Sequence, residues 1–180
     1  MRLVVVIGMI SIVISFVLCG CKIYSWKVLE NSEFPDQANP AELDTDVLEK
    51  YTVGNVIVHP RILYMDGEMT TQQLFVVFFS RTNTSKVAIK NVTMWINENE
   101  LEYGDSLIDV PASDWSLYSR SKKFYVCSIG GTAINYPKEK LLKNGVQLSL
   151  TISVENENGK AYEKQINAEF VPKKRAVIGR

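Results

Sequence analysis

Residues 146–170 have the sequence VQLSLTISVENENGKAYEKQINAEF, in which apolar and polar side chains alternate along two stretches. Every second residue is Val, Leu or Ile across residues 146–154, and the same spacing recurs less regularly across residues 162–170. This alternation is typical of antiparallel strands with one face in a core and the other in water. Asn158-Gly159, between the stretches, readily adopts positive φ angles, so the sequence predicts a β-hairpin.

Four earlier stretches, near residues 53–65, 72–81, 87–97 and 122–129, also predict strands. The run from Leu74 to Phe79 is apolar at every position, so we expect a central strand with both faces covered. Either a helix or loop of this chain covers the second face, or another protein does. Strict alternation in residues 87–97 predicts two faces, one with Val92, Met94 and Ile96 and the other with Val87, Ile89 and Trp95.

A short helix is predicted near residues 40–50. Asn39 can cap it, Pro40 fits its first turn, and Glu42 stands three residues after the cap. The apolar residues Leu43, Val47 and Tyr51 are four apart and share a face. This helix either covers one end of the sheet or contacts a partner.

Two further segments differ from the strand pattern. Residues 137–143 predict a turn or two of helix, which Asn144-Gly145 ends. Residues 22–50 carry three basic and seven acidic side chains, and within them residues 22–38 are interpreted as an extended, solvated tether. The basic cluster Lys173-Lys174-Arg175, with Arg180, could contact anionic lipid headgroups. The favoured alternative is a disordered polar tail, residues 173–180.

This pattern predicts a mainly β fold: an antiparallel two-layer β-sandwich over residues 39–172 with one or two short helices. The sandwich resembles immunoglobulin- and fibronectin-type domains in strand pattern alone, because the Cys–Trp–Cys hallmark of antibody domains is absent. A small β-barrel is the alternative.

The first 20 residues have the parts of a secretory signal peptide: the basic Arg2, an apolar run from Leu3 to Leu18, and small residues at a cleavage site. The run ends in Leu18-Cys19-Gly20-Cys21, which resembles the lipobox of bacterial lipoproteins. That resemblance implies cleavage before Cys21 and a diacylglycerol thioether on its sulfur. The alternative is an uncleaved transmembrane helix, for which the run is short.

The lipoprotein resemblance also implies a location. Lys22 follows the lipidated cysteine, and in enteric-type bacteria a residue other than Asp there favours the outer membrane. We therefore expect a lipid-anchored protein in the cell envelope, on the outer membrane and facing the periplasm. In a bacterium without an outer membrane, the same anchor would lie in the outer leaflet of the plasma membrane. The lipidated Cys21 and the flexible tether together span residues 21–38, and they would separate the β domain from the bilayer.

Composition excludes some partners and cofactors. The chain has 20 basic and 20 acidic residues, so it lacks the positive charge that nucleic acid binding needs, and we expect no nucleic acid partner. Removal of Cys19 with the leader and acylation of Cys21 leave Cys127 as the one free thiol, so no internal disulfide can form. No cluster has the spacing of a zinc or calcium site, and no metal or other cofactor is expected.

Candidate catalytic residues are weak. The single histidine, His59, could pair with Cys127, but a cysteine on an apolar strand usually behaves as a small hydrophobe. Glu98, Glu100 and Glu102 could supply a carboxylate pair, although alternating acids beside a turn are usually a solvated edge. We therefore predict that the protein is not an enzyme.

Binding candidates are apolar and aromatic. Trp115 and Tyr118 lie in a long polar loop, residues 104–121, where binding residues concentrate. Phe75, Val77 and Phe79 could form an exposed strip on the central strand. The sequence favours a lipid-anchored, non-catalytic protein that binds an envelope or secreted protein, as an immunity protein or adaptor. The alternatives are an envelope hydrolase acting on glycan or peptide and a structural subunit of an envelope-spanning machine.

Overall fold

The computed structural model describes residues 22–64, 72–103 and 107–179. These residues divide into two units. The larger comprises Val28–Lys173, and the described part of the smaller comprises residues 22–27 and 174–179. Cys21 and the predicted leader lie outside the described residues. Within the described part of the chain, no helix is both long enough and apolar enough to span a bilayer.

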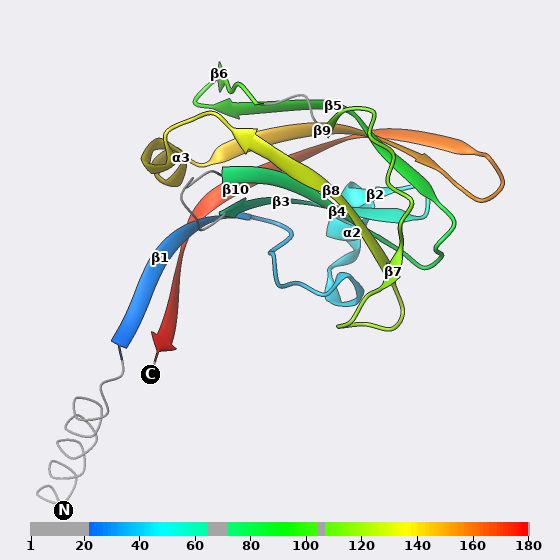
Figure 1. Cartoon of the computed structure of the whole chain (residues 1–180), viewed down its shortest axis with the longest axis horizontal. Helices are drawn as coiled ribbons and strands as arrows, with labels where there is room; N and C mark the ends of the chain where they lie inside the picture. Colours follow the sequence, from blue (N-terminus) through cyan, green and yellow to red (C-terminus); the bar gives the residue numbers. More distant parts are fainter. Residues whose placement is uncertain (1–21, 65–71, 104–106, 180) are drawn as a thin grey trace, which may run out of the picture. The chain divides into compact units, whose positions relative to one another are not determined.

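The larger unit is a two-layer antiparallel β-sandwich, as the sequence predicted (Figure 1). The sheets do not close, so the alternative of a small barrel is wrong for the residues described. One layer, here called the β9 sheet, has the order β1 (Lys22–Asn31), β10 (Ala161–Gly179), β9 (Val146–Glu155), β5 (Lys86–Ile96) and β6 (Asn99–Glu100). The other, the β4 sheet, has the order β2 (Thr52–Val53), β3 (Val56–Tyr64), β4 (Gln72–Ser80), β8 (Tyr125–Ile134) and β7 (Ser116–Leu117).

The predicted hairpin is β9 and β10. Its register pairs Val154 with Tyr162 and Val146 with Phe170, and Gly159 in the turn has a φ of 73°. The alternating apolar side chains of β9 point into the core, and those of β10 join them at Ile166 and Phe170. The period of two therefore predicted correctly which side chains of this hairpin face the core.

The other predicted strands are present as β3, β4, β5 and β8, but β5 has a feature that alternation missed. Its register with β9 shifts between Ile89 and Asn91, so Lys90 is a β-bulge. The extra residue reverses the parity of the strand, and Val87 and Ile89 are buried on the same side as Met94. The prediction that Val87 and Ile89 share the face of Trp95 is wrong for this reason.

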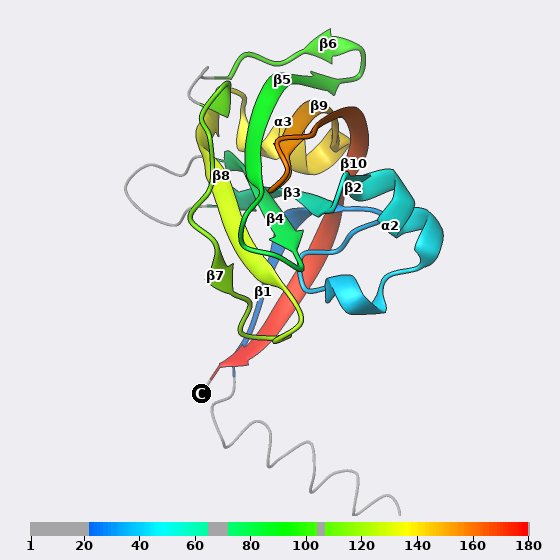
Figure 2. The ribbon, with the colours of Figure 1, turned by 90° about the vertical axis from the view of Figure 1, so that its right-hand side faces the viewer.

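The apolar strand β4 lies in the centre of its sheet, between β3 and β8, as predicted (Figure 2). Leu74, Val76 and Phe78 are fully buried in the core between the sheets. They pack against the inward side chains of β5 and β9, which have an exposed fraction of at most 3%. Burial of this many branched and aromatic side chains is the main stabilising contribution.

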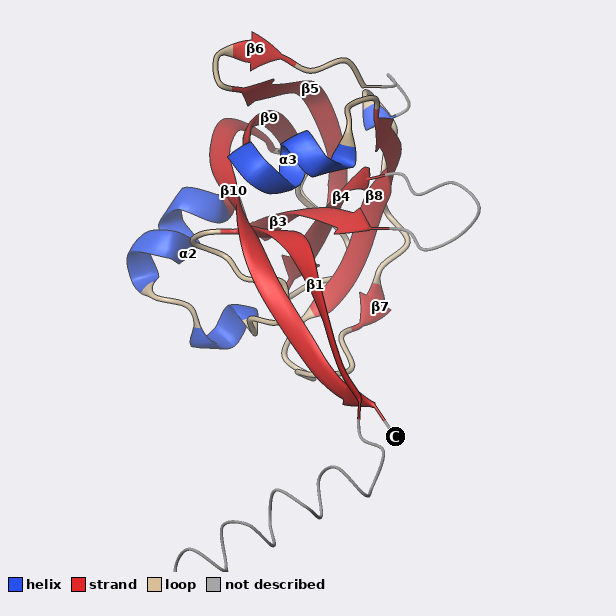
Figure 3. Ribbon diagram, turned by 90° about the vertical axis from the view of Figure 1, so that its left-hand side faces the viewer, coloured by secondary structure: helices blue, strands red, loops and turns tan. Residues whose placement is uncertain are grey.

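Short helices lie beside the strands of the sandwich (Figure 3). The segment predicted as one helix forms a 3₁₀ turn, η1 (Pro40–Glu42), and a separate helix α2 (Thr45–Tyr51). The Asn39 cap is confirmed, because its Oδ1 accepts a hydrogen bond from the Ala41 amide at 3.1 Å. Leu43 and Val47 pack on the core beside the fully buried Tyr51, so this segment covers its own domain.

The second predicted helix is α3 (Lys138–Asn144). Gly145 follows it with a φ of 76° and a ψ of −177°, a conformation that other residues rarely adopt. A Cβ atom built on Gly145 would also lie 2.5 Å from the carbonyl oxygen of Phe170. This glycine lets the chain enter β9 directly against β10.

The tether prediction is wrong, because residues 22–31 form strand β1 and Leu29 and Phe34 are buried. The acidic residues of residues 22–50 all lie at or after Glu30. The negative net charge of the whole segment suggested a solvated tether, although residues 22–29 contain no acid and form a strand. The prediction of a disordered tail is also wrong, because β10 continues through Lys173 to Gly179. Lys173 pairs with the buried Glu30 on β1 at 2.6 Å.

Candidate functional site

The outer face of the β4 sheet carries three predicted binding residues, Phe75, Val77 and Phe79. They alternate with the core residues of β4, so they point away from the other sheet. Phe79 is only 4% exposed, because the edge of the Tyr118 ring packs on it with centroids 5.0 Å apart. Cover by the same chain is thus confirmed at Phe79, while Phe75 and Val77 remain half-buried.

Cover for the neighbouring strand β3 comes from the segment that was predicted to be a tether. The imidazole of His59 stacks on Phe34 with centroids 3.8 Å apart, and its Nε2 donates to the Phe34 carbonyl at 3.0 Å. Arg61 reaches Asp36 of the same segment at 3.3 Å. Burial lowers the pKa of His59 from 6.5 to about 3, with a smaller contribution from the charge of Arg61. His59 is therefore a neutral packing residue at neutral pH.

Trp115, the loop candidate, has a structural contact. Its indole Nε1 donates to the carbonyl of Ser85 at 2.6 Å, and its ring packs partly on the core. Next to it, Ala112 and Val87 exchange two backbone hydrogen bonds of 2.8 and 3.1 Å. These contacts hold residues 110–116 against the end of β5. Trp115 therefore positions this segment and does not join Phe75, Val77 and Phe79 in one strip.

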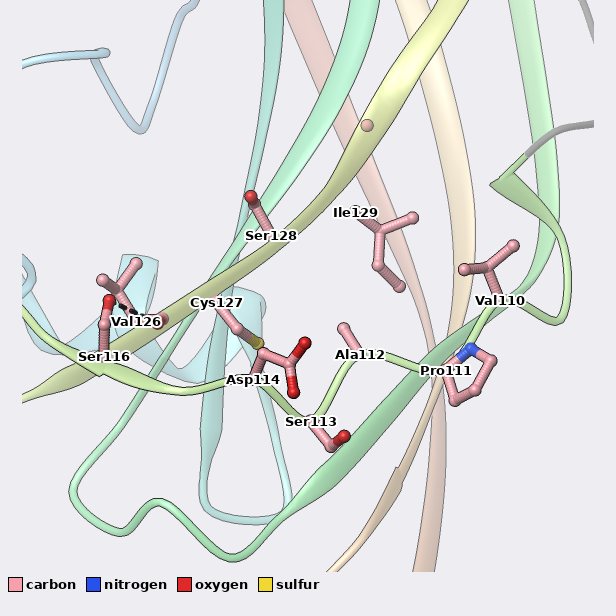
Figure 4. A pocket seen from close by; sticks show the side chains of 11 residues that line it. Val110, Pro111, Ala112, Ser113, Asp114, Ser116, Val126, Cys127, Ser128 and Ile129 are labelled. Atoms are coloured by element: carbon pink, nitrogen blue, oxygen red, sulfur yellow. Dashed lines mark hydrogen bonds between the residues drawn. The ribbon is translucent and has the colours of Figure 1, made fainter.

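A groove of about 570 Å³ lies between the held segment and strand β8 (Figure 4). One wall is the chain from Val110 to Asp114 with Ser116, and the other is five consecutive residues of β8, Val126 to Gly130. Figure 4 shows Cys127 and Ile129 on one side of β8 and Ser128 on the other. Side chains from both faces of β8 line the groove, whereas a groove on one face of a sheet would meet only every second residue of a strand. The groove therefore runs along the edge of β8.

The edge of β8 at this groove has no partner strand within the described ranges. Strand β7 pairs with β8 only at Tyr125 and Val126, and the next bridge on that side is at Ile134. The carbonyls of Phe124 and Val126 point to this side, because they accept from the Tyr118 amide and the Ser116 hydroxyl. Backbone groups alternate along a strand, so those of Ser128 and Gly130 also face the groove.

The groove is mildly acidic and mostly uncharged. Asp114 is the one charged side chain that lines it, and within the described residues it forms no ion pair. Burial, with a smaller effect from the charge of Asp114, raises the pKa of Cys127 to about 12. The thiol is therefore neutral at neutral pH, and Cys127 is a small apolar group in the wall.

The catalytic candidates do not come together. His59 pairs with Val77, which pairs with Ser128, so His59 shares a face of the sheet with Ser128. Cys127 is adjacent to Ser128 and points to the opposite face. Glu98, Glu100 and Glu102 are exposed at the β5–β6 turn. Of the residues that the structure describes, no three His, Cys, Asp or Glu side chains are grouped as metal ligands.

Sequence reasoning missed the groove. Strand β8 has a bulge at this point, because its register with β4 shifts between Gly130 and Thr132. Gly131 has a φ of 105° at this shift. Gly130 makes room for the Phe75 ring, because a Cβ atom built on Gly130 would lie 2.0 Å from Phe75 Cδ1. The pair of glycines therefore marks the bulge and this close side-chain approach.

Comparisons with known proteins gave no match to any family model, any curated protein sequence or any solved structure.

Proposed function

We propose that the protein is a lipid-anchored, non-catalytic envelope protein of bacteria that binds another envelope or secreted protein along the open edge of β8. The anchor is inferred from Leu18-Cys19-Gly20-Cys21, with Cys21 as the lipidated residue. Two or more acyl chains hold a protein durably on a membrane. The outer membrane, facing the periplasm, is the proposed location.

The open edge of β8 in the groove supports the binding role. Unpaired backbone donors and acceptors on a strand edge are a template for an added strand, and natural proteins usually block such edges. Here the blocking strand β7 pairs with β8 only as far as Val126, and the edge of β8 beyond Val126 lies in the 570 Å³ groove. An extended peptide segment satisfies these backbone groups directly and places alternate side chains on the groove walls.

The charge of the groove indicates which side chains the partner's extended segment carries. Asp114 lines the groove without an ion pair in the described part of the chain, so a Lys or Arg side chain of the partner is favoured beside it. The neutral Cys127, with Ile129 and Val110, offers apolar contacts for the neighbouring partner residues. The proposed partner therefore presents an extended segment that combines apolar and basic residues.

Site-specific photo-crosslinking in living cells tests the proposal. A photoreactive amino acid at Ser128 lies on the groove edge, and one at Glu163 lies on the exposed face of β10 as a control. We expect a discrete crosslinked protein from position 128 and not from position 163. No crosslink at position 128, or the same products from both positions, contradicts binding at this edge.

Two substitutions at Ser128 separate backbone pairing from side-chain contact. Ser128→Pro removes an amide that faces the groove and spares the hydrogen bonds to β4, while Ser128→Ala keeps that amide. With the photoreactive group moved to Ser116, we expect Ser128→Pro to reduce crosslinking strongly and Ser128→Ala to leave it unchanged. Equal crosslinking by both variants, with both folded by circular dichroism, contradicts strand addition.

A further inference from the structure

The strands β1 and β10 are hydrogen-bonded neighbours, and their outer ends form a separate small unit with residues 22–27 on one strand and 174–179 on the other. Figure 1 shows these two ends side by side. This pair of strand ends is here called the terminal ribbon. It brings residues 22–27 next to the basic residues Lys174 and Arg175, although most of the chain separates them in sequence.

The terminal ribbon carries charge of one sign. Residues 22–27 contain Lys22 and Lys27, residues 174–179 contain Lys174 and Arg175, and neither segment contains an Asp or Glu. Lys27 and Lys174 are exposed and form no ion pair with any residue that the structure describes. The chain as a whole has a formal net charge of zero, so this is a local excess of positive charge.

An aromatic side chain accompanies the charge. Trp26 is 44% exposed, a large fraction for an indole ring in a protein with a well-filled core. Its neighbours Ser25 and Lys27 are exposed as well. Because successive side chains of a strand point to opposite faces, both faces of β1 are open to solvent at this position. Tryptophan and basic residues together are enriched where proteins meet the headgroups of a bilayer.

We propose that the terminal ribbon is a membrane-docking surface that binds anionic phospholipid headgroups, with Trp26 in the interface and Lys27 and Lys174 on the phosphates. The inference extends the proposed function, because Cys21 immediately precedes the ribbon and its lipid would insert into the same bilayer. Basic side chains near an anionic leaflet each strengthen binding severalfold. The ribbon would thus add a second, electrostatic contact to the lipid anchor.

The soluble chain that begins at Lys22 tests the ribbon without the lipid. The hydrophobic residues whose burial the structure describes lie within residues 28–173, so this chain retains that core. The probes are vesicles of phosphatidylcholine with phosphatidylglycerol and vesicles of phosphatidylcholine alone. We expect sedimentation with the anionic vesicles only, weaker in high salt, and a blue shift of tryptophan fluorescence that Trp26→Phe abolishes.

A matched pair of charge reversals locates the contact. Lys27→Glu with Lys174→Glu changes the ribbon, and Lys122→Glu with Lys123→Glu makes the same change of net charge on an exposed loop of the larger unit. We expect the first pair to weaken vesicle binding by about tenfold or more and the second pair to have little effect. Thermal melting establishes that both double variants are folded.

Three results overturn the proposal: no binding of the unlipidated chain to anionic vesicles, equal losses in the two double variants, or binding without a change that depends on Trp26. The first would leave the lysines as a charged edge that prevents strand-to-strand aggregation. Failure here is distinct from failure of the anchor. If the native protein carries lipid on Cys21 but the soluble chain does not bind vesicles, the anchor is supported and the membrane contact of the terminal ribbon is contradicted. If Cys21 carries no lipid but the soluble chain binds anionic vesicles, the anchor is contradicted and the contact of the ribbon is supported.

Discussion

The imidazole of His59 lies flat on the phenyl ring of Phe34, with centroids 3.8 Å apart and planes within 3° of parallel. This contact fixes the segment after β1 to the outer face of β3. Phe34 is fully buried and His59 is 2% exposed, so the pair forms a small apolar layer outside the main core. The edge of the Tyr51 ring packs on the same Phe34, with centroids 5.7 Å apart, which connects this layer to α2.

Removal of Phe34 tests that layer. We predict that Phe34→Ala lowers the free energy of unfolding by about 3–5 kcal/mol, because it deletes a fully buried ring and leaves a cavity. The matched control is Phe75→Ala on the half-buried part of the same sheet face, which we expect to cost clearly less. Urea titration of both variants gives the comparison, and equal losses would contradict the assignment of Phe34 to a core layer.

Acid should weaken the fold through His59. Its pKa is about 3 in the folded protein and about 6.5 when unfolded, so both states are neutral above pH 6.5. As the pH falls below 6.5 the unfolded state alone gains a proton, and stability decreases until the folded state titrates near pH 3. From pH 7 to pH 5 we predict a loss of about 2 kcal/mol.

The variant His59→Phe isolates this effect, because it keeps a ring on Phe34 and His59 is the one histidine of the chain. We expect lower stability at pH 7, since the Phe34 carbonyl loses its donor, but little further change between pH 7 and pH 5. The measurement is the urea midpoint at each pH. The same pH dependence in both proteins would show that another group is responsible.

Two glycines with similar φ angles should differ in their tolerance of alanine. At Gly145 a Cβ atom would lie 2.5 Å from the Phe170 carbonyl oxygen, whereas at Gly159 it meets nothing within 4 Å. We predict that Gly159→Ala costs about 1 kcal/mol, from backbone strain alone, and that Gly145→Ala costs about 2–4 kcal/mol. Thermal unfolding of the two variants measures the difference. A smaller loss at Gly145 than at Gly159 would contradict the close approach.

Trp115 should stabilise the wall of the groove. Trp115→Phe keeps an aromatic ring and removes the donor to the Ser85 carbonyl, so we predict a loss of about 1 kcal/mol. We also expect faster hydrogen exchange of the Ala112 amide, which bonds to Val87 in the same segment. Exchange of the Ile152 amide in the core strand β9 serves as the internal reference. Unchanged exchange at Ala112 would mean that Trp115 does not hold the segment.

Period-two patterns predicted the strands well wherever the ladder is regular. The β9–β10 hairpin has the predicted turn and faces, because the pattern and the Asn-Gly turn agree. Alternation failed at Lys90, since a single bulged residue reverses the parity of the strand. The signal in the sequence was the pair of consecutive polar residues Lys90-Asn91, which interrupts the spacing of the apolar residues. The strand β1 was also missed, because the acidic residues from Glu30 onward set the net charge of residues 22–50, which were interpreted as beginning with a tether.

The candidate site was less predictable for a physical reason. Aromatic residues in a long loop, such as Trp115, suggested contact surfaces, yet a hydrogen bond to Ser85, 30 residues away, holds this side chain beside the groove. The groove depends on where β7 stops along β8, which is a property of strand pairing and not of any one side chain. In the sequence, Gly130 and Gly131 mark the bulge of β8 beside the groove but not the end of its pairing with β7.

The anchor on Cys21 is the central claim, since the envelope location and the partner class depend on it. Mass spectrometry of the intact protein, extracted from the membranes of its own cells, tests the claim most directly. We predict a chain that begins at Cys21, without residues 1–20, and carries the added mass of acyl chains on that residue. A native chain that begins at Met1, or one whose Cys21 carries no lipid, would contradict the account.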